Sequence, residues 1–286
     1  MSNHKHHSKK KKKLIRNTIS TLLSFVLTIF IAIVLCAISM QFGFFDNDLI
    51  LSKINESNYY NNVYSELTNN INTILESKNL PTDLVAECIS DKRVYINGKQ
   101  YIDNSLNGKD TIVAVDKINE ELEVIFVDYY ESNGIRIDET VQNSIDSLIS
   151  DIDSEYMRMI RFQFVDYIKN YKADYKQIMT WLLPFTIILS AIIILVLLNV
   201  HRYPHRGVRF TAIALFSASV INMLLPLYCI INKMYDGLNI LPDYYCNFLE
   251  TYIKWSCYAF VYVGVFGIVV AFILFGIMRV LKHNIK

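Results

Sequence analysis

Four long runs without a charged side chain constrain the fold more than any other feature of this sequence. The runs are 22 to 24 residues long and cover Thr18–Met40, Ile178–Val200, Phe210–Ile231 and Trp255–Met278. About 20 such residues cross the hydrocarbon core of a bilayer as a helix, and in lipid only a helix or a closed barrel satisfies its own backbone hydrogen bonds. The sequence therefore predicts an all-α integral membrane protein with four transmembrane helices.

Basic residues flank these runs at the ends that we expect to face the cytoplasm. Five lysines and Arg16 precede the first run, and positive charges at that place hold an N-terminus in the cytoplasm. The five are Lys9, Lys10, Lys11, Lys12 and Lys13. Four passes then place the loop 201–209 and the tail 279–286 on the same side, and both are basic and lack acids. We therefore predict that both termini are cytoplasmic and that the lysines contact anionic lipid.

Two tryptophans support this orientation. Trp181 and Trp255 fall at the predicted outer ends of the second and fourth helices, where indole rings prefer the headgroup level. We expect both to anchor the chain at the membrane interface. The first run is much longer than the apolar part of a signal peptide, about 7–15 residues, and no cleavage site of small residues follows it. We therefore expect an uncleaved first helix.

The predicted organisation alternates short cytoplasmic segments with larger extracytoplasmic ones. In chain order it comprises a basic cytoplasmic tail (1–17), transmembrane helix 1 (18–40), an acidic extracytoplasmic helical domain (41–177), transmembrane helix 2 (178–200), a cytoplasmic loop (201–209), transmembrane helix 3 (210–231), an extracytoplasmic loop (232–254), transmembrane helix 4 (255–278) and a cytoplasmic tail (279–286). Residues 42–176 contain 24 acidic and 13 basic side chains, a net charge of −11. We favour a solvated polar surface there over a specific site for a cation or a basic partner.

Apolar residues of the domain between the first two runs recur at helical spacing. Between Tyr95 and Leu106, Asn97-Gly98 would suit a hairpin turn, but we favour a helix because Tyr101, Ile102 and Leu106 share one helical face. Thr82 or Asp83 is predicted to cap a short helix that reaches Cys88, and Asn133-Gly134 is predicted to end a longer one.

The last helix of this domain is predicted to begin at Asp138. No proline or glycine follows between Ile135 and Pro184, so we expect this helix to run into the membrane without a loop. Such a connection either transmits a rotation or a displacement, or simply anchors the domain.

The transmembrane runs contain no charge, which makes their polar and small residues the candidate site residues. Asn222 is expected to form an interhelical hydrogen bond, with a substrate contact as the alternative. In the fourth run, small residues on one stripe predict close helix packing; they are Gly264, Gly267 and Ala271. Pro184 and Pro226 lie at similar depths and are expected to kink their helices, which either opens a small vestibule or adjusts packing.

The sequence lacks the motifs of nucleotide-binding proteins, zinc proteases and serine hydrolases. We therefore predict no catalytic residue, no cofactor and no metal site, and His4, His6 and His7 belong to a tail without fixed geometry. The cytoplasmic segments are too short for a nucleic-acid-binding domain, so nucleic acid is not an expected partner. A disulfide of Cys246 with Cys88 or Cys229 remains open.

The leading functional hypothesis is a non-enzymatic plasma-membrane protein that acts as an envelope sensor or as an accessory subunit of a membrane complex. Its expected partners are the lipid bilayer and a membrane or envelope protein, or further copies of the chain. One alternative is a transporter or channel component that works as an oligomer, with Asn222, Pro184 and Pro226 near its path. A second alternative is an extracytoplasmic hydrolase. The frequent Ile, Asn, Lys and Tyr suggest an AT-rich genome and favour a bacterial source.

Overall fold

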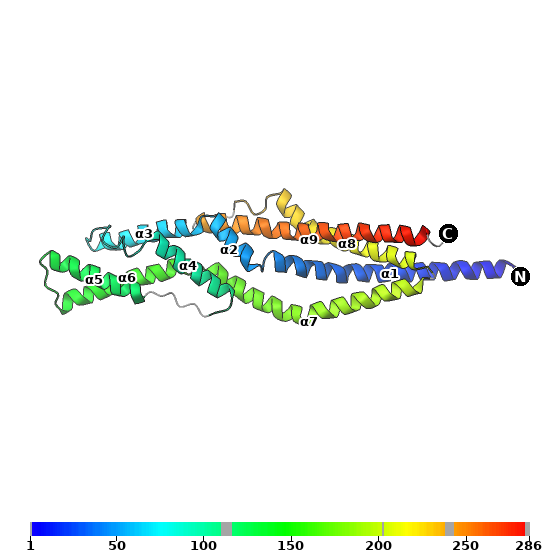
Figure 1. Cartoon of the computed structure of the whole chain (residues 1–286), viewed down its shortest axis with the longest axis horizontal. Helices are drawn as coiled ribbons and strands as arrows, with labels where there is room; N and C mark the ends of the chain where they lie inside the picture. The colour runs from blue at the N-terminus through cyan, green and yellow to red at the C-terminus, as the bar shows by residue number, and fades with distance from the viewer. Residues whose placement is uncertain (1, 110–115, 202, 238–242, 284–286) are drawn as a thin grey trace. The chain divides into compact units, whose positions relative to one another are not determined.

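Nine helices and no strand make up the part of the chain that the structure describes. The structure is a computed structural model. It describes residues 2–109, 116–201, 203–237 and 243–283, excluding the side chains of 2–13, 116 and 243. In chain order the helices are α1 (Ser2–Phe42), α2 (Asn47–Glu56), α3 (Tyr59–Ser77), α4 (Asp91–Leu106), α5 (Asp116–Ser132), α6 (Glu139–Ile160), α7 (Gln163–Val200), α8 (Pro204–Ile231) and α9 (Asp243–His283) (Figure 1). The predicted all-α class is confirmed for these residues.

Within the described ranges, four helices are long and apolar enough to cross a membrane. They are Leu14–Phe42 of α1, all of α7, all of α8, and Tyr244–His283 of α9. This finding confirms the predicted number of apolar helices and indicates a multi-pass membrane protein. Each helix extends beyond the uncharged run inside it, because the polar residues next to the run can continue the same helix outside the apolar region. In particular, α9 begins at Asp243, inside the segment 232–254 that the sequence suggested as a loop.

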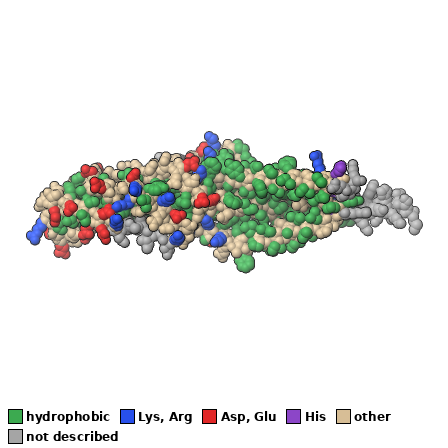
Figure 2. Space-filling model, in the orientation of Figure 1, with side chains coloured by type: hydrophobic (Ala, Val, Ile, Leu, Met, Phe, Trp, Pro, Cys, Tyr) green, Lys and Arg blue, Asp and Glu red, His purple; other side chains and the backbone are tan. Residues whose placement is uncertain are grey.

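The chain divides into two compact units. The apolar unit comprises Met1–Asp46, Ala173–Leu238 and Tyr252–Lys286, and the polar unit comprises Asn47–Lys172 and Asn239–Thr251. Helices α7 and α9 therefore contribute residues to both. Hydrophobic side chains cover the visible face of the apolar unit, whereas acidic and basic side chains gather over the polar unit (Figure 2).

In the apolar unit, α1 packs along α8, and a small core includes Leu27, Leu197 and Ala214. Ser24 Oγ donates a hydrogen bond to the carbonyl of Phe210 over 3.0 Å. Gly207, in the first turns of α8, lies so close to α7 that an added Cβ would be 2.6 Å from the carbonyl oxygen of Leu197. The sequence alone does not single out this glycine, although it permits a close approach between α7 and α8.

In the polar unit, α3 packs against α4 and α6, and α5 packs against α6. Its fully buried side chains include Leu67, Ile102 and Phe126. Residues 91–106 form the helix α4, so the preference for a helix over a hairpin is confirmed. Gly98 lies inside this helix, and a Cβ there would be 3.1 Å from the ring of Tyr60.

The predicted signals for the ends of helices are confirmed at two places and wrong at a third. Asp138 caps α6 by accepting a hydrogen bond from the Val141 amide over 2.9 Å. Gly134 ends α5 with a φ of +75°, in the left-handed region that glycine adopts without strain. Residues 82–88 form consecutive turns and no short helix, and several amides there bond to carbonyls three residues earlier, as Ala86 does to Asp83.

The predicted unbroken helix from Asp138 into the membrane is also wrong. Helix α6 ends at Ile160, Arg161 is extended, and α7 begins at Gln163. The interruption buries the ring of Phe162 completely among aromatic side chains of the polar unit. A single long helix would require helical backbone angles at Arg161 and Phe162, and the structure has an extended Arg161 there instead.

Candidate functional site

Six aromatic residues of the polar unit, part of a network of rings that continues through Tyr60 to Tyr95, form the group called here the aromatic cluster. They are Tyr59, Phe162, Phe164, Tyr244, Tyr245 and Phe248. The ring of Phe162 lies at the centre, with its centroid 4.7 Å from that of Tyr59 and 5.3 Å from those of Tyr245 and Phe248. The cluster therefore joins the start of α3 to the first turns of α7 and α9. Burial raises the pKa of the Tyr59 phenol well above its ordinary value, which keeps it neutral.

A pocket of about 380 Å³ lies beside this cluster, called here the polar-unit pocket. Aromatic, basic and acidic side chains line it, among them Tyr167, Tyr244, Arg158, Arg161 and Glu66. Arg158 forms a forked ion pair with Glu155, with distances of 2.8 Å and 2.5 Å, and these hydrogen bonds lower the pKa of the Glu155 carboxyl. The pocket offers ring faces for stacking and groups for hydrogen bonding, as small-ligand sites commonly do.

A second charged group links α4 to α5. Arg93 donates two hydrogen bonds to the Glu121 carboxylate, over 2.7 Å and 3.1 Å. The thiol of Cys88 is buried nearby, 3.6 Å from the Arg93 guanidinium. Burial, reinforced by Glu121, raises the pKa of Cys88 to about 12. The thiol is therefore protonated at neutral pH, and the group ties two helices together.

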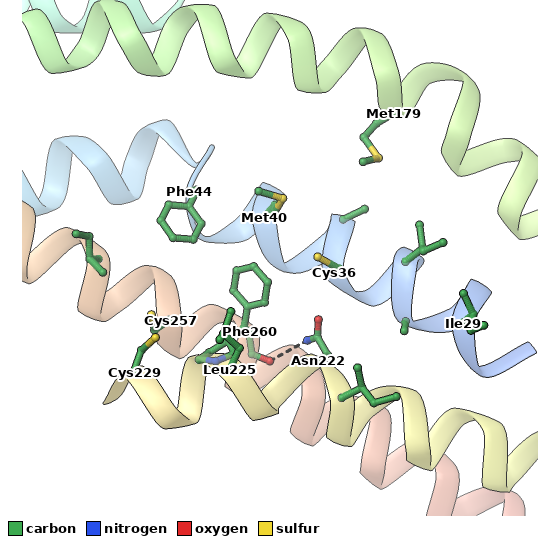
Figure 3. A pocket seen from close by; sticks show the side chains of 16 residues that line it. Ile29, Cys36, Met40, Phe44, Met179, Asn222, Leu225, Cys229, Cys257 and Phe260 are labelled. Atoms are coloured by element: carbon green, nitrogen blue, oxygen red, sulfur yellow. Dashed lines mark hydrogen bonds between the residues drawn. The ribbon is translucent and has the colours of Figure 1, made fainter. Parts of the chain in front are cut away.

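The apolar unit contains a cavity of about 700 Å³, called here the apolar cavity. Side chains from α1, α7, α8 and α9 line it, and no charged residue is among them (Figure 3). Three of its lining residues are cysteines, and Met40 and Met179 add two thioethers. Pro226 lines the cavity, whereas Pro184 is not among its lining residues. Each proline lies inside a helix that continues on both sides of it.

Asn222 is the polar residue of this cavity, and its side chain is 7% exposed. The amide nitrogen donates to Ser39 Oγ of α1 over 3.0 Å and to the carbonyl of Phe260 of α9 over 3.1 Å. The amide oxygen is buried and has no hydrogen-bond partner among the described residues. Figure 3 shows it turned away from Phe260 and toward α1. One amide thus connects three helices and leaves one acceptor unused.

The predicted small-residue stripe of α9 lies against α8. A Cβ added at Gly264 would be 2.1 Å from Met223 Cγ, and one at Gly267 would be 2.2 Å from Ser219 Oγ. Ala271 is fully buried. These distances support a packing role for the stripe.

The two tryptophans predicted to anchor the chain at the membrane interface lie in different surroundings. Trp181 is 81% exposed, and Trp255 lies in α9 with its ring near that of Tyr258. Lys9, Lys10, Lys11, Lys12 and Lys13 belong to α1, and their side chains lie outside the described part of the chain.

His201 is a buried polar residue whose environment the sequence did not reveal. Its Nε2 lies 2.9 Å from Ser20 Oγ, and its ring stacks on that of Phe210 at a centroid distance of 5.6 Å. Burial, together with the charge of Arg16 and Arg206, lowers the pKa of this imidazole. A neutral His201 therefore holds the connection between α7 and α8 against α1.

Within the described ranges, no three His, Cys, Asp or Glu side chains lie close enough together to hold a metal ion. All five cysteines fall in these ranges, and no disulfide joins them. No protein-family model matches the chain, and no curated protein or solved structure is significantly similar to it.

Proposed function

We propose that the chain is a non-enzymatic plasma-membrane protein that acts as an envelope sensor or as an accessory subunit of a membrane complex. In this proposal the polar unit is extracytoplasmic and both termini are cytoplasmic. The net charge of −11 over residues 42–176 and the basic flanks of the apolar runs support that orientation. The polar unit would receive a ligand or an envelope protein, and the apolar helices would pass the change to a neighbouring membrane protein.

The aromatic cluster is the observation that carries this proposal. In this cluster the start of α7 and the first turns of α9 both pack against one side chain, Phe162, which has no exposed surface. Both helices then continue into the apolar unit. A packed aromatic group has few alternative arrangements, so a ligand that displaces Tyr244 or Tyr245 changes the start of both helices together. The polar-unit pocket gives a ligand access to these two tyrosines.

Photocrosslinking in intact cells tests the proposal. A photoreactive amino acid replaces Tyr167, which lines the polar-unit pocket and is 62% exposed, or Val124, which is 60% exposed on α5. We expect a discrete crosslinked product from position 167, identified by mass spectrometry, and a much weaker one from position 124. Equal labelling at both positions, combined with a purely monomeric protein after native purification, would contradict the proposal.

The apolar cavity favours a second candidate, a transporter component for an apolar solute. Its lining offers no charge to coordinate an ion, so ion conduction is the less suitable form of this candidate. Reconstitution into vesicles distinguishes the two functions. Uptake of an apolar dye that depends on the protein and falls in Asn222→Leu would support transport, and leakage equal to that of protein-free vesicles would exclude it.

A further inference from the structure

The apolar cavity is long and follows α1. Its lining positions on that helix run from Ile29 to Met40, which corresponds to about 17 Å at 1.5 Å per residue. One leaflet of a bilayer has a hydrocarbon thickness of about 15 Å. The cavity is thus long enough to hold an extended hydrocarbon chain, and its helices are those apolar enough to lie in the membrane.

Water and charged groups are unsuitable occupants of this cavity. An ordered water molecule needs two to four polar partners. The lining provides few polar atoms beyond those of Asn222 and the backbone. A phosphate or ammonium group would find no opposite charge among the lining residues, and burying an unpaired charge is costly. Hydrocarbon therefore fits most of the cavity.

The amide oxygen of Asn222 adds a specific requirement. It is an acceptor without a partner, while the nitrogen of the same amide is already held by Ser39 and Phe260. The hydrocarbon core of a membrane holds little water, so protein and lipid are the main sources of a partner for such a group. A plain acyl chain leaves the oxygen unpaired, whereas a hydroxyl group satisfies it.

We propose that the apolar cavity binds a lipid with a free hydroxyl group, whose chain lies along α1 and whose hydroxyl donates a hydrogen bond to Asn222 Oδ1. Surrounding side chains cover this oxygen, so the hydroxyl reaches it as they adjust. This proposal is independent of the sensor function.

The test compares two probes that differ only in the hydroxyl group. The full chain, purified in detergent, is titrated with oleyl alcohol and with cis-9-octadecene, and each probe displaces a fluorescent fatty alcohol. We expect about fivefold tighter binding of the alcohol, the effect of one hydrogen bond in a membrane protein. In Asn222→Leu the two probes should bind equally. The matched control is Asn199→Leu, since Asn199 is an exposed asparagine of α7 outside the cavity, and it should keep the preference.

A second variant keeps the test decisive if Asn222→Leu does not fold. Cys36 is exposed and lines the cavity, so Cys36→Phe fills part of the volume and leaves Asn222 in place. We expect it to weaken binding of both probes at least about tenfold without lowering the melting temperature, since filling a cavity commonly stabilises a protein. Equal affinity of the original protein for alcohol and alkene would overturn the hydroxyl requirement. Unchanged binding in Cys36→Phe would overturn the location.

Discussion

Gly207 shows how a single missing side chain sets the distance between two helices. A Cβ at this position would lie 2.6 Å from the Leu197 carbonyl oxygen and 2.7 Å from the Leu198 Cα. Both atoms belong to the backbone, which adjusts far less readily than the end of a side chain. The close approach of α7 and α8 therefore depends on glycine here.

We predict that Gly207→Ala lowers the stability of the purified protein by about 1–3 kcal/mol, because overpacking strains the helices on both sides. Thermal unfolding in detergent measures the change. Gly276→Ala is the matched control, since nothing lies within 4 Å of a Cβ added in α9 at that position. It should leave the melting temperature unchanged or raise it, as alanine favours a helix more than glycine. Equal effects of the two substitutions would contradict the steric explanation.

Cys88 offers a test that depends on pH. Burial raises its pKa to about 12 in the folded protein, whereas an unfolded thiol titrates near about 8.5. A raised pKa means that the unfolded state loses its proton first. The contribution to stability is therefore complete below about pH 8.5 and is lost as the pH rises toward 12.

The expected result is very slow maleimide labelling of Cys88 at pH 8, in a protein whose other cysteines are replaced by serine. Only about one thiol in ten thousand is ionised at that pH if the pKa is 12. Addition of denaturant should make labelling rapid. Fast labelling of the folded protein would show that the thiol is accessible, contrary to the structure.

At the scale of helices, uncharged runs and cap residues predicted where helices lie and begin, whereas features that depend on long-range packing could not be predicted. The run Ile178–Val200 predicts a helix by itself, and Asp138 marks a helix start through its own side chain. The break at Arg161 and Phe162 has no local signal. It exists because Phe162 packs on Tyr59 and Phe248, which are about 100 and 86 residues away in the sequence.

Replacing this central ring tests its importance for the elements around it. We predict that Phe162→Ala destabilises the polar unit by about 3–5 kcal/mol, the usual cost of removing a buried phenylalanine. Hydrogen exchange of α3 and of the first turns of α7 and α9 should accelerate together. Tyr171→Ala, which removes an exposed ring from α7, should change stability by less than about 0.5 kcal/mol. Faster exchange confined to α7 would show that the cluster does not link these helices.

For the whole molecule, the distribution of charge predicts the side on which each segment lies. We expect epitope tags at Met1 and Lys286 to be inaccessible in intact cells, because basic residues flank both ends of the membrane region. A tag inserted after Gly134, an exposed position between α5 and α6, should be accessible to antibody. Antibody binding at either terminus before permeabilisation would reverse the assignment of sides.

The candidate sites were predictable to different degrees. Asn222 stood out because amides are rare in apolar helices, and its hydrogen bonds join α1 and α9 in the structure. The two prolines suggested a small vestibule as one alternative, and Pro226 lines the apolar cavity. The extent of this cavity and the polar-unit pocket could not be predicted, since each is lined by helices whose mutual packing is not encoded in any local pattern. Gly207 and His201 were missed for the same reason, because their importance depends on Leu197 and Ser20.

The polar unit is assembled from two stretches of sequence, Asn47–Lys172 and Asn239–Thr251. A soluble fragment cut from the first stretch alone would lack Tyr244, Tyr245 and Phe248 and would expose the ring of Phe162 to water. Such a fragment should aggregate or bind hydrophobic dyes. Anyone who wishes to crystallise this half of the protein without detergent should graft the short second stretch onto the first through a flexible tether.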